Sequence, residues 1–494
     1  MGWMLDQTQT PLLSALIQSS GRPHAPFYAP GHKRGQGTPA ALKQLLGEAV
    51  FRADLPELPE LDNLFSPAGV IADAQALAAE AFGAEHTWFL ANGSTCGIEA
   101  AVLSTCRPGD KIIVPRNAHQ SVVSALILSG AVPVWVQPEY DPDWDLVLGV
   151  APDAIAQALD QHPDCRAVLL VSPTYHGLCS DLAEIAQLTH ARNIPLLVDE
   201  AHGPHFAFHP DLPTSALVAG ADLVVQSTHK VLAALTQASM LHIQGGRICR
   251  QRLQRALQLT QSTSPSYLLL ASLDAARQQM ALEGRDRLEE TLELVGQVRS
   301  HLQTLPGLCV LSPAHLQRWP SCHELDLTRL TVSVSDLGLT GFEADSLLHE
   351  ELGVTAELPA LRHLTFIVSL GNVPEDGERL IQGLTTLSKR YAFSSGNWTK
   401  PEPWPRESLS VASVPPVTPR DAFFAPTETV LVDQALGRLS AETLCPYPPG
   451  IPLLLPGEQI TAAALTTLQQ IHQAGGQITG CADPTLATLV VLRD

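Results

Sequence analysis

An α/β fold with a mainly parallel sheet is predicted by the alternation of two kinds of segment in the sequence. From about Asp73 to Met240, short apolar runs bounded by turn residues alternate with helix-like stretches. This alternation is typical of βαβ units, in which helices cover both faces of a parallel sheet. The chain has 494 residues, more than a single core holds, so smaller domains are expected beside the sheet. The predicted strands are HTWFL from His86, DKIIVP from Asp110, AVPVWV from Ala131, RAVLLVSP from Arg166, IPLLVDE from Ile194 and ADLVVQS from Ala221.

Helices are predicted in the segments between these runs. ADAQALAAEAF has the apolar periodicity of a helix, and STCGIEAAVLS begins a helix after Asn92 and Gly93. Ligands of open α/β sheets bind outside the carboxyl ends of the strands. We therefore expect the functional residues where the predicted strands end.

After about Gly284 the pattern changes to that of a smaller α+β domain. A long polar helix pattern leads into strand-like LTRLTVSVSDL, helix-like GFEADSLLHEEL and strand-like LRHLTFIVSL. From Phe393 to Pro419 the chain is rich in Ser and Pro, which is typical of a linker or a surface strap. The predicted divisions are an N-terminal segment (1–35), a large domain (36–285), a small α+β domain (286–395), a linker (396–420) and a C-terminal subdomain (421–494).

The composition narrows the class of protein. Apolar residues make up 45% and charged residues 16%, so the chain is expected to fold. The net charge of −20 disfavours a nucleic-acid partner and is compatible with a cationic substrate. Nine Cys without a CxxC pair fit a reducing cytoplasm better than a disulfide framework. The N-terminus lacks a secretory signal pattern and no run approaches the roughly 20 apolar residues that span a bilayer, so no membrane association is expected.

The segment Asn92-Gly93-Ser94-Thr95 follows the first predicted strand and begins a helix. Free backbone N–H groups and the positive dipole end of a helix, with two hydroxyls beside them, favour phosphate binding. A Ser or Thr after Gly is more often a simple N-cap. Taken alone, the segment is compatible with either interpretation.

Asp199 lies at the end of the predicted strand IPLLVDE. Burying a carboxylate there is costly without a cationic partner. A protonated pyridine nitrogen would serve, and so would a metal ion, since His202, His205 and His209 follow closely. Their spacing suits one face of a helix, but the Gly-Pro between His202 and His205 argues against a helix and thus against the metal site.

Lys230 follows the predicted strand ADLVVQS, in the segment Ser227-Thr228-His229-Lys230. Desolvation at a buried strand end lowers the pKa of a lysine toward that of a nucleophilic amine, and such lysines form Schiff bases. An ordinary surface lysine on a loop is the alternative. Asp199 and Lys230 are separated by roughly 30 residues, the length of one βα unit, which favours the Schiff base.

His119 lies in Asn117-Ala118-His119, after the predicted strand DKIIVP. An imidazole at this strand end can stack on a planar ring, although a single loop histidine is more often structural or solvated. The four strand-end segments together are more specific than any one of them.

These residues resemble those of fold-type I pyridoxal-phosphate (PLP) enzymes, and among them the bacterial ornithine/lysine/arginine decarboxylases. The similarity extends over nearly the whole chain and is greatest to the short, Bacillus-type arginine or lysine decarboxylases, which lack an N-terminal wing domain. The motifs are FYAPGHKRG from Phe27, LDNLFSPAGVIADAQALAAEAFGA from Leu61, NGSTCG from Asn92, PRNAHQS from Pro115, SPTYHG from Ser172, LVDEAHGPHF from Leu197, STHKVLAALTQAS from Ser227, STSPSYLLLASLD from Ser262 and CPYPPGIPLLLPGE from Cys445.

The resemblance implies an aspartate-aminotransferase-like PLP domain with smaller α+β domains after it. It implies that Lys230 is the Schiff-base lysine, that Asp199 pairs with the pyridine nitrogen and that His119 stacks on the ring. The other implied residues are Ser94, Thr95 and Ser227, which hold the phosphate; Ser262, which reaches the phosphate of the neighbouring subunit's cofactor; His202, near the phenolic oxygen of the ring; and His229, near the reacting carbon.

The resemblance also implies the reaction. A basic amino acid (arginine, lysine or ornithine) is decarboxylated to agmatine, cadaverine or putrescine, and Lys230 or His229 returns a proton to the α-carbon. The implied assembly is a homodimer or a dimer of dimers with shared active sites, in the cytoplasm, with a role in polyamine biosynthesis.

Substrate contacts are the least determined part of the predicted site. The remote cationic end of the substrate needs a carboxylate, for which Glu458 in PGEQ is the prediction and an ordinary surface glutamate the alternative. The segment Pro30-Gly31-His32 either closes the site of a partner subunit, as the resemblance implies, or forms only a turn. His176 departs from the family pattern, and no arginine is assigned to the α-carboxylate.

Two other hypotheses stay open. The same core residues serve other fold-type I activities, namely aldolases, lyases and aminotransferases, and fold does not fix function. A keto acid or aldehyde product would identify those. A non-catalytic relative that regulates polyamine enzymes would lack the absorbance of a lysine-bound cofactor.

Overall fold

The structure is a computed structural model that describes residues 5–392, 413–447 and 450–493. Its centre is a seven-stranded sheet with the order β1-β10-β9-β8-β6-β2-β3, which confirms the predicted α/β fold. Six strands run parallel, and each coincides with a predicted apolar run. They are β1 (His86–Leu90), β2 (Lys111–Pro115), β3 (Val132–Val136), β6 (Ala167–Val171), β8 (Leu196–Asp199) and β9 (Leu223–Gln226).

The seventh strand, β10 (Ser239–Ile243), was not predicted. It runs antiparallel to both of its neighbours, β1 and β9. The carboxyl ends of the six parallel strands therefore lie at one edge of the sheet.

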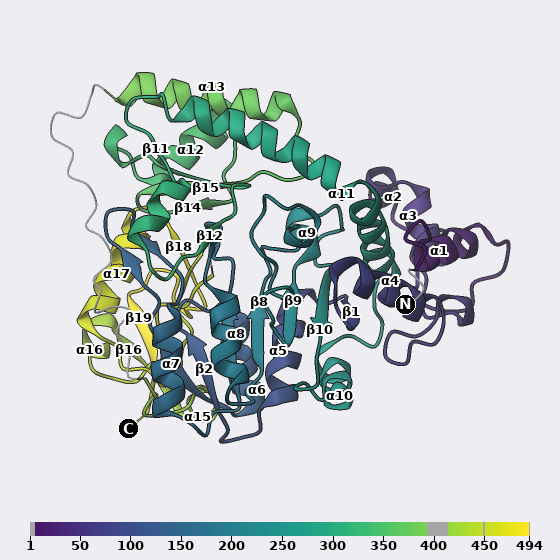
Figure 1. The fold of residues 1–494 in the computed structure, drawn as a ribbon, viewed down its shortest axis with the longest axis horizontal. Coiled ribbons are helices and arrows are strands. Elements are labelled where there is room, and N and C mark those ends of the chain that lie inside the picture. Colours follow the sequence, from purple (N-terminus) through teal and green to yellow (C-terminus); the bar gives the residue numbers. More distant parts are fainter. Residues whose placement is uncertain (1–4, 393–412, 448–449, 494) are drawn as a thin grey trace.

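Helices cover both faces of this sheet (Figure 1). On one face lie α5, α6 and α10, and on the other α1, α4, α7, α8 and the first half of α11. Their bounds are α1 (Pro11–Gly21), α4 (Val70–Phe82), α5 (Gly93–Thr105), α6 (Gln120–Ser129), α7 (Pro152–Gln161), α8 (Leu182–His190), α10 (Arg250–Thr260) and α11 (Tyr267–Leu302). Two short helices, α2 (Ala40–Leu46) and α3 (Glu48–Ala53), follow α1.

The beginning of α5 lies directly against the sheet because residue 97 is a glycine. A Cβ atom at Gly97 would be 2.7 Å from the Leu90 side chain and 2.8 Å from that of Val225. Real Cβ contacts are not that short, so the close approach of α5 to β1 and β9 requires glycine. The packing fixes the N-terminus of α5 at the edge where the strands end.

The small domain has an antiparallel sheet with the order β11-β13-β15-β14, covered by α12 and α13. Its strands and helices include the predicted β13, α12 and β15. The bounds are β11 (Cys309–Val310), β13 (Arg329–Ser333), β14 (Leu358–Pro359), β15 (His363–Ile367), α12 (Gly341–Leu352) and α13 (Pro374–Tyr391).

The large and small domains share the helix α11, which has 36 residues. Its second half contributes Val295, Val298 and Leu302 to the core of the small domain. The predicted boundary at residue 285 falls inside this helix. The two domains are also joined by β7 (Leu178–Cys179), which pairs with β12 (Glu324–Leu325).

The C-terminal part forms a third core around α17 and a pair of strands. Its elements are α15 (Pro419–Phe424), β16 (Thr427–Leu431), α16 (Val432–Ala435), β17 (Cys445–Tyr447), α17 (Ala462–Gln473), β18 (Gln477–Thr479) and β19 (Thr488–Leu492). The predicted linker at 396–420 lies mostly outside the described residues. The domain limits as a whole stay predictions.

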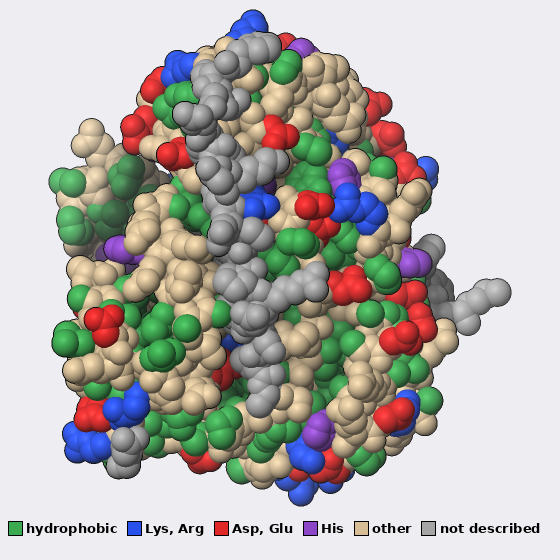
Figure 2. All heavy atoms as spheres, turned by 90° about the vertical axis from the view of Figure 1, so that its left-hand side faces the viewer, with side chains coloured by type: hydrophobic (Ala, Val, Ile, Leu, Met, Phe, Trp, Pro, Cys, Tyr) green, Lys and Arg blue, Asp and Glu red, His purple; other side chains and the backbone are tan. Residues whose placement is uncertain are grey.

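Charged side chains are dispersed on the face shown in Figure 2, where Lys and Arg lie among Asp and Glu. In residues 5–392, 413–447 and 450–493, no helix has both the length and the apolar character needed to cross a membrane.

Candidate functional site

The edge of the sheet where the parallel strands end carries the predicted functional residues. His119 follows β2, Asp199 ends β8, and Lys230 lies on the one-turn helix α9 (Thr228–Val231), directly after β9. Figure 1 shows α9 beyond the ends of β8 and β9. Strands β8 and β9 are neighbours, with Asp199 paired to Val225 in the register, so the carboxylate and the amine come from adjacent strand ends.

Lys230 is held among aromatic rings. Its Nζ lies 3.0 Å from Nε2 of His202 and 5.9 Å from the ring centre of Tyr175. Burial lowers the pKa of Lys230, while the carboxylates of Asp199 and Glu357 act in the opposite direction. A lysine in this setting is closer to a neutral, nucleophilic amine than a surface lysine is.

Asp199 is 5% exposed and accepts a hydrogen bond from the backbone N–H of Ala201 at 3.1 Å. Burial raises the pKa of this carboxyl, and the nearby Lys230 lowers it. Because a buried carboxylate is stabilised by a cation, the site favours a ligand with a positive charge at this end.

A phosphate-sized anion would fit at the N-terminus of α5. The N-cap residue Asn92 makes no side-chain bond to the first turn, so the N–H groups there are not capped. Ser227 donates its hydroxyl to Ser94 Oγ at 2.8 Å, and the exposed Thr95 adds a third hydroxyl. The backbone N–H of Ser262 donates to Asn92 Oδ1 at 3.1 Å, which places that loop beside the helix start. Uncapped N–H groups, the helix dipole and hydroxyls together favour an anion.

Two histidines border the site as neutral rings. His119 caps α6, where its Nδ1 accepts from the backbone N–H of Ser121 at 3.2 Å. Burial and the neighbouring Lys230 lower the pKa of His119 to about 4. The Nδ1 atom of His229 lies 3.0 Å from the carbonyl oxygen of Ala238, and burial lowers its pKa. A neutral ring can stack on a heteroaromatic ligand without charge repulsion.

The residues present thus fit PLP. An amine for the aldehyde, a buried carboxylate for the ring nitrogen and an uncapped helix start for the phosphate occur at one edge of the sheet. The individual roles of these residues stay predictions.

Two charged residues of the small domain act on residues of the site and were not predicted. Arg329, at the start of β13, donates through Nη2 to the carbonyl oxygen of His202 at 2.9 Å. Glu357, just before β14, is exposed, and its charge acts on both Lys230 and Arg329. Neither residue follows a strand of the large sheet in the sequence, so a search of the segments after those strands could not identify them.

Glu458, predicted as a substrate ligand, is paired within the chain. Its Oε2 lies 2.9 Å from Arg116 Nη2, and both side chains are buried. Arg116 also donates to the carbonyl oxygens of Pro452 and Leu453. This pairing favours a structural role for Glu458, which joins the C-terminal part to the end of β2.

The three histidines considered for a metal site have separate partners. His205 pairs with Asp326 at 3.1 Å and His209 with Glu289 at 3.0 Å, whereas His202 contacts Lys230. Among the described ranges, no group of three or more His, Cys, Asp or Glu side chains is placed to hold a metal ion. His176, which the sequence analysis singled out, is half-buried and lies 3.0 Å from Thr365 Oγ1 of the small domain.

Glu200, next to Asp199, predicts a pH dependence of stability. Burial raises its pKa from 4.5 to about 8, although Gln226 and Ala216 donate to it. The folded chain therefore binds this proton more tightly than the unfolded chain. The contribution of this proton to the free energy of unfolding is complete below pH 4.5. It is lost as the pH rises to about 8, and the free energy of unfolding then falls by up to about 1.4 kcal/mol per pH unit.

We expect Glu200→Gln to remove this loss. Between pH 5 and pH 8, the free energy of unfolding of the variant should fall by a few kcal/mol less than that of the native chain. Chemical denaturation at several pH values measures the difference. The exposed Glu350, changed to Gln, is the matched control. Parallel stability curves for the native chain and Glu200→Gln would contradict the prediction.

The fold identifies the class of protein to which the chain belongs. A ureidoglycine-glyoxylate aminotransferase from Bacillus subtilis superposes with a TM-score of 0.53 at 14% identity, covering 68% of this chain and 89% of that one. Lysine decarboxylase A from Pseudomonas aeruginosa superposes with a TM-score of 0.82 at 24% identity, covering 98% and 80%. The chain has the aspartate-aminotransferase-like fold of the fold-type I class.

The sequence comparisons then identify the family. Residues 10–320 match the Orn/Lys/Arg decarboxylase major domain, and residues 407–482 match the Orn/Lys/Arg decarboxylase C-terminal domain. A protein of Bacillus subtilis (strain 168) named arginine decarboxylase is 40% identical over 491 residues, 99% of each chain. The chain belongs to the Orn/Lys/Arg decarboxylase family, which confirms the resemblance found in its motifs.

Proposed function

We propose that the protein is a PLP-dependent decarboxylase of a basic amino acid, with arginine as the first candidate substrate. The observation that carries the proposal is the contact of Lys230 with His202 beside the strand-end carboxylate Asp199. Membership of the decarboxylase family supports the reaction type. The relative that extends over the full chain and is named arginine decarboxylase supports the choice of arginine.

When bound, PLP supplies an electron sink for the pair of electrons left on the α-carbon after the carboxylate departs. The protein determines which bond is oriented for cleavage and where protons are held. With the cofactor present, Lys230 would hold its aldehyde carbon through the amine, and as the free ammonium it would be the acid that returns a proton to the α-carbon. Asp199 would keep a proton on the pyridine nitrogen. His119 would lie against the ring, and His229 is a second candidate for the proton transfer.

The remote guanidinium or ammonium of the substrate needs a carboxylate partner. Glu357 fills this role in the proposal because its charge acts on Lys230 and its side chain is exposed to an incoming ligand. Glu458, whose carboxylate already pairs with Arg116, is the weaker candidate.

The assembly belongs to the same proposal. We propose a cytoplasmic homodimer or dimer of dimers in which Ser262 reaches the neighbouring subunit's site. Phe27 is 96% exposed, and a second copy would cover an apolar side chain of this kind.

A product assay tests the proposed reaction. The purified protein with PLP is incubated separately with L-arginine, L-lysine and L-ornithine, and the amines are quantified. We expect agmatine to form fastest. A keto acid or an aldehyde would indicate another fold-type I activity, and no amine from any of the three substrates would refute the proposal.

A further inference from the structure

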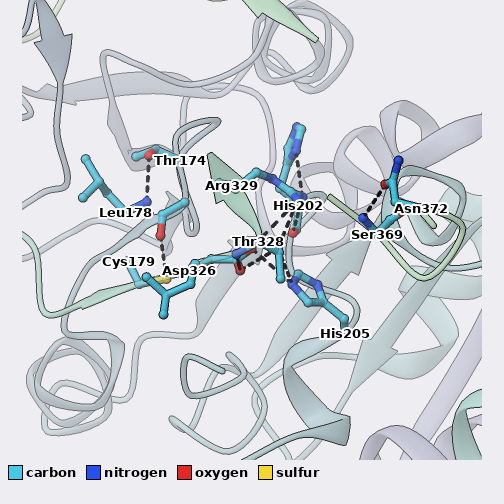
Figure 3. A network of polar contacts seen from close by, with 12 residues as sticks. Thr174, Leu178, Cys179, His202, His205, Asp326, Thr328, Arg329, Ser369 and Asn372 are labelled. Atoms are coloured by element: carbon cyan, nitrogen blue, oxygen red, sulfur yellow. Dashed lines mark hydrogen bonds and ion pairs between the residues drawn. The ribbon is translucent and has the colours of Figure 1, made fainter. Parts of the chain in front are cut away.

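A buried arginine of the small domain is linked to Lys230 through one imidazole ring. Arg329 is fully buried, and its Nη2 lies 2.9 Å from the carbonyl oxygen and 3.4 Å from Nδ1 of His202. On the other side of the same ring, Nε2 lies 3.0 Å from Lys230 Nζ. Figure 3 shows Arg329 directed toward His202.

The chemistry of the guanidinium determines where the proton of His202 lies. A guanidinium has five N–H donors and no acceptor, so Nδ1 of His202 must accept from it. Burial, followed by the charge of Lys230, lowers the pKa of His202 well below its ordinary value, so the ring is neutral. A neutral imidazole carries one proton, and that proton is therefore on Nε2, directed at Lys230.

A donor directed at Nζ of Lys230 favours one state of the amine. The neutral amine has a lone pair that accepts the hydrogen bond, whereas the ammonium has only donors. In the other tautomer, Nε2 would accept from the ammonium and stabilise the charged lysine. The contact of Arg329 thus selects the tautomer that favours the reactive amine.

The small domain holds Arg329 in place on several sides. Arg299 donates to the carbonyl oxygen of Arg329 at 2.6 Å, and the carboxylate of Asp326 lies 3.9 Å from Nη1. Asp326 is itself fixed by His205 at 3.1 Å and by the hydroxyl of Thr328 at 2.7 Å (Figure 3).

Other groups around Lys230 act on its proton as well. The titratable or charged groups that face it from the elements packed around it are His119 after β2, Tyr175 after β6, Asp199 at the end of β8, His202 after β8, His229 on α9, and Arg329 and Glu357 of the small domain. The two carboxylates favour the ammonium. The His202 donor and the positive charge of Arg329 oppose them.

We propose that Arg329 is a positioning residue that, through the tautomer of His202, keeps Lys230 as a neutral amine ready to bind the cofactor. The inference rests on the proposed function, in which Lys230 carries PLP. It assigns to the small domain a role in preparing the amine before any ligand is bound.

Competitive labelling of the protein without cofactor tests this role. Acetic anhydride reacts with neutral amines, and mass spectrometry gives the extent of acetylation of each lysine from pH 6 to pH 11. We expect Arg329→Met to shift the Lys230 profile by about one pH unit or more to higher pH, so that about tenfold less neutral amine is present near neutrality. The profile of Lys111, a half-buried lysine paired with Asp164, is the internal control and should not move.

A double-mutant cycle separates the relay from a direct effect of charge. If Arg329 acts through His202, Arg329→Met shifts the Lys230 profile less than half as much in the His202→Phe background as in the native one. An unchanged profile in Arg329→Met, or equal shifts in both backgrounds, would overturn the proposal. If Arg329→Met does not fold, Arg329→Gln replaces it in the same cycle, because the amide of Gln is uncharged and has an acceptor as well as donors.

The labelling requires neither PLP nor substrate. A shifted profile in a protein that forms no amine would refute the proposed decarboxylation and leave the positioning role of Arg329 supported. An unchanged profile in a protein that does form the amine would overturn the positioning role of Arg329 and leave the proposed decarboxylation supported.

Discussion

Lys230→Ala is expected to lower the rate of amine formation by at least about a thousandfold, equivalent to about 4 kcal/mol of barrier. The variant loses both the amine that binds the cofactor and the acid that returns the proton. Circular dichroism should show a folded chain, since alanine is tolerated in a one-turn helix such as α9. The absorbance of a lysine-bound cofactor at about 420 nm should also disappear.

Lys111→Ala is the control for this change. Lys111 lies at the start of β2, at the opposite edge of the sheet, and forms an ion pair with Asp164. Its loss should leave the rate and the absorbance unchanged. A Lys230→Ala variant that keeps more than a tenth of the native rate would remove Lys230 from the mechanism.

Glu357→Gln is expected to reduce kcat/KM for the preferred basic amino acid by about a hundredfold, the effect of losing one charge-assisted contact of about 2 to 3 kcal/mol. The amide keeps the size of the carboxylate but not its charge. Because the charge of Glu357 also acts on Lys230, its loss should shift the pH profile of kcat/KM to lower pH.

Two matched variants are the controls for this result. Glu350→Gln changes an exposed glutamate on α12 and should leave kcat/KM within a factor of two of the native value. Glu458→Gln should lower the stability of the chain because it weakens the buried pair with Arg116. If Glu458→Gln raises KM while Glu357→Gln does not, the cationic end of the substrate is bound by Glu458.

Much of the large domain was predictable because its strands are buried on both faces. Such strands appear in the sequence as continuous apolar runs, and all six parallel strands were identified in this way. Strand β10 follows the Lys230 segment after a short loop, and its antiparallel direction has no signature in the sequence. The uninterrupted helix α11 was also not predicted, because a helical pattern says nothing about which of two cores each half joins.

The proximity of Asp199 and Lys230 could be predicted because it depends on neighbouring strands. Asp199 and Lys230 come from β8 and β9, which are adjacent, so a spacing of one βα unit was enough to bring them together. Arg329 contacts His202 from a different domain, and the charge of Glu357 acts on Lys230 from that domain. Both effects depend on how the two domains are arranged. The pair formed by Arg116 and Glu458 likewise depends on how the C-terminal part is placed against the large domain.

The large and small domains are connected at several separate places, and this has a consequence for the site. The helix α11 passes from one domain into the other, and β7 pairs with β12 at a separate place. Because Arg329 already contacts His202, and His202 contacts Lys230, the small domain does not need to close before Lys230 is under its influence.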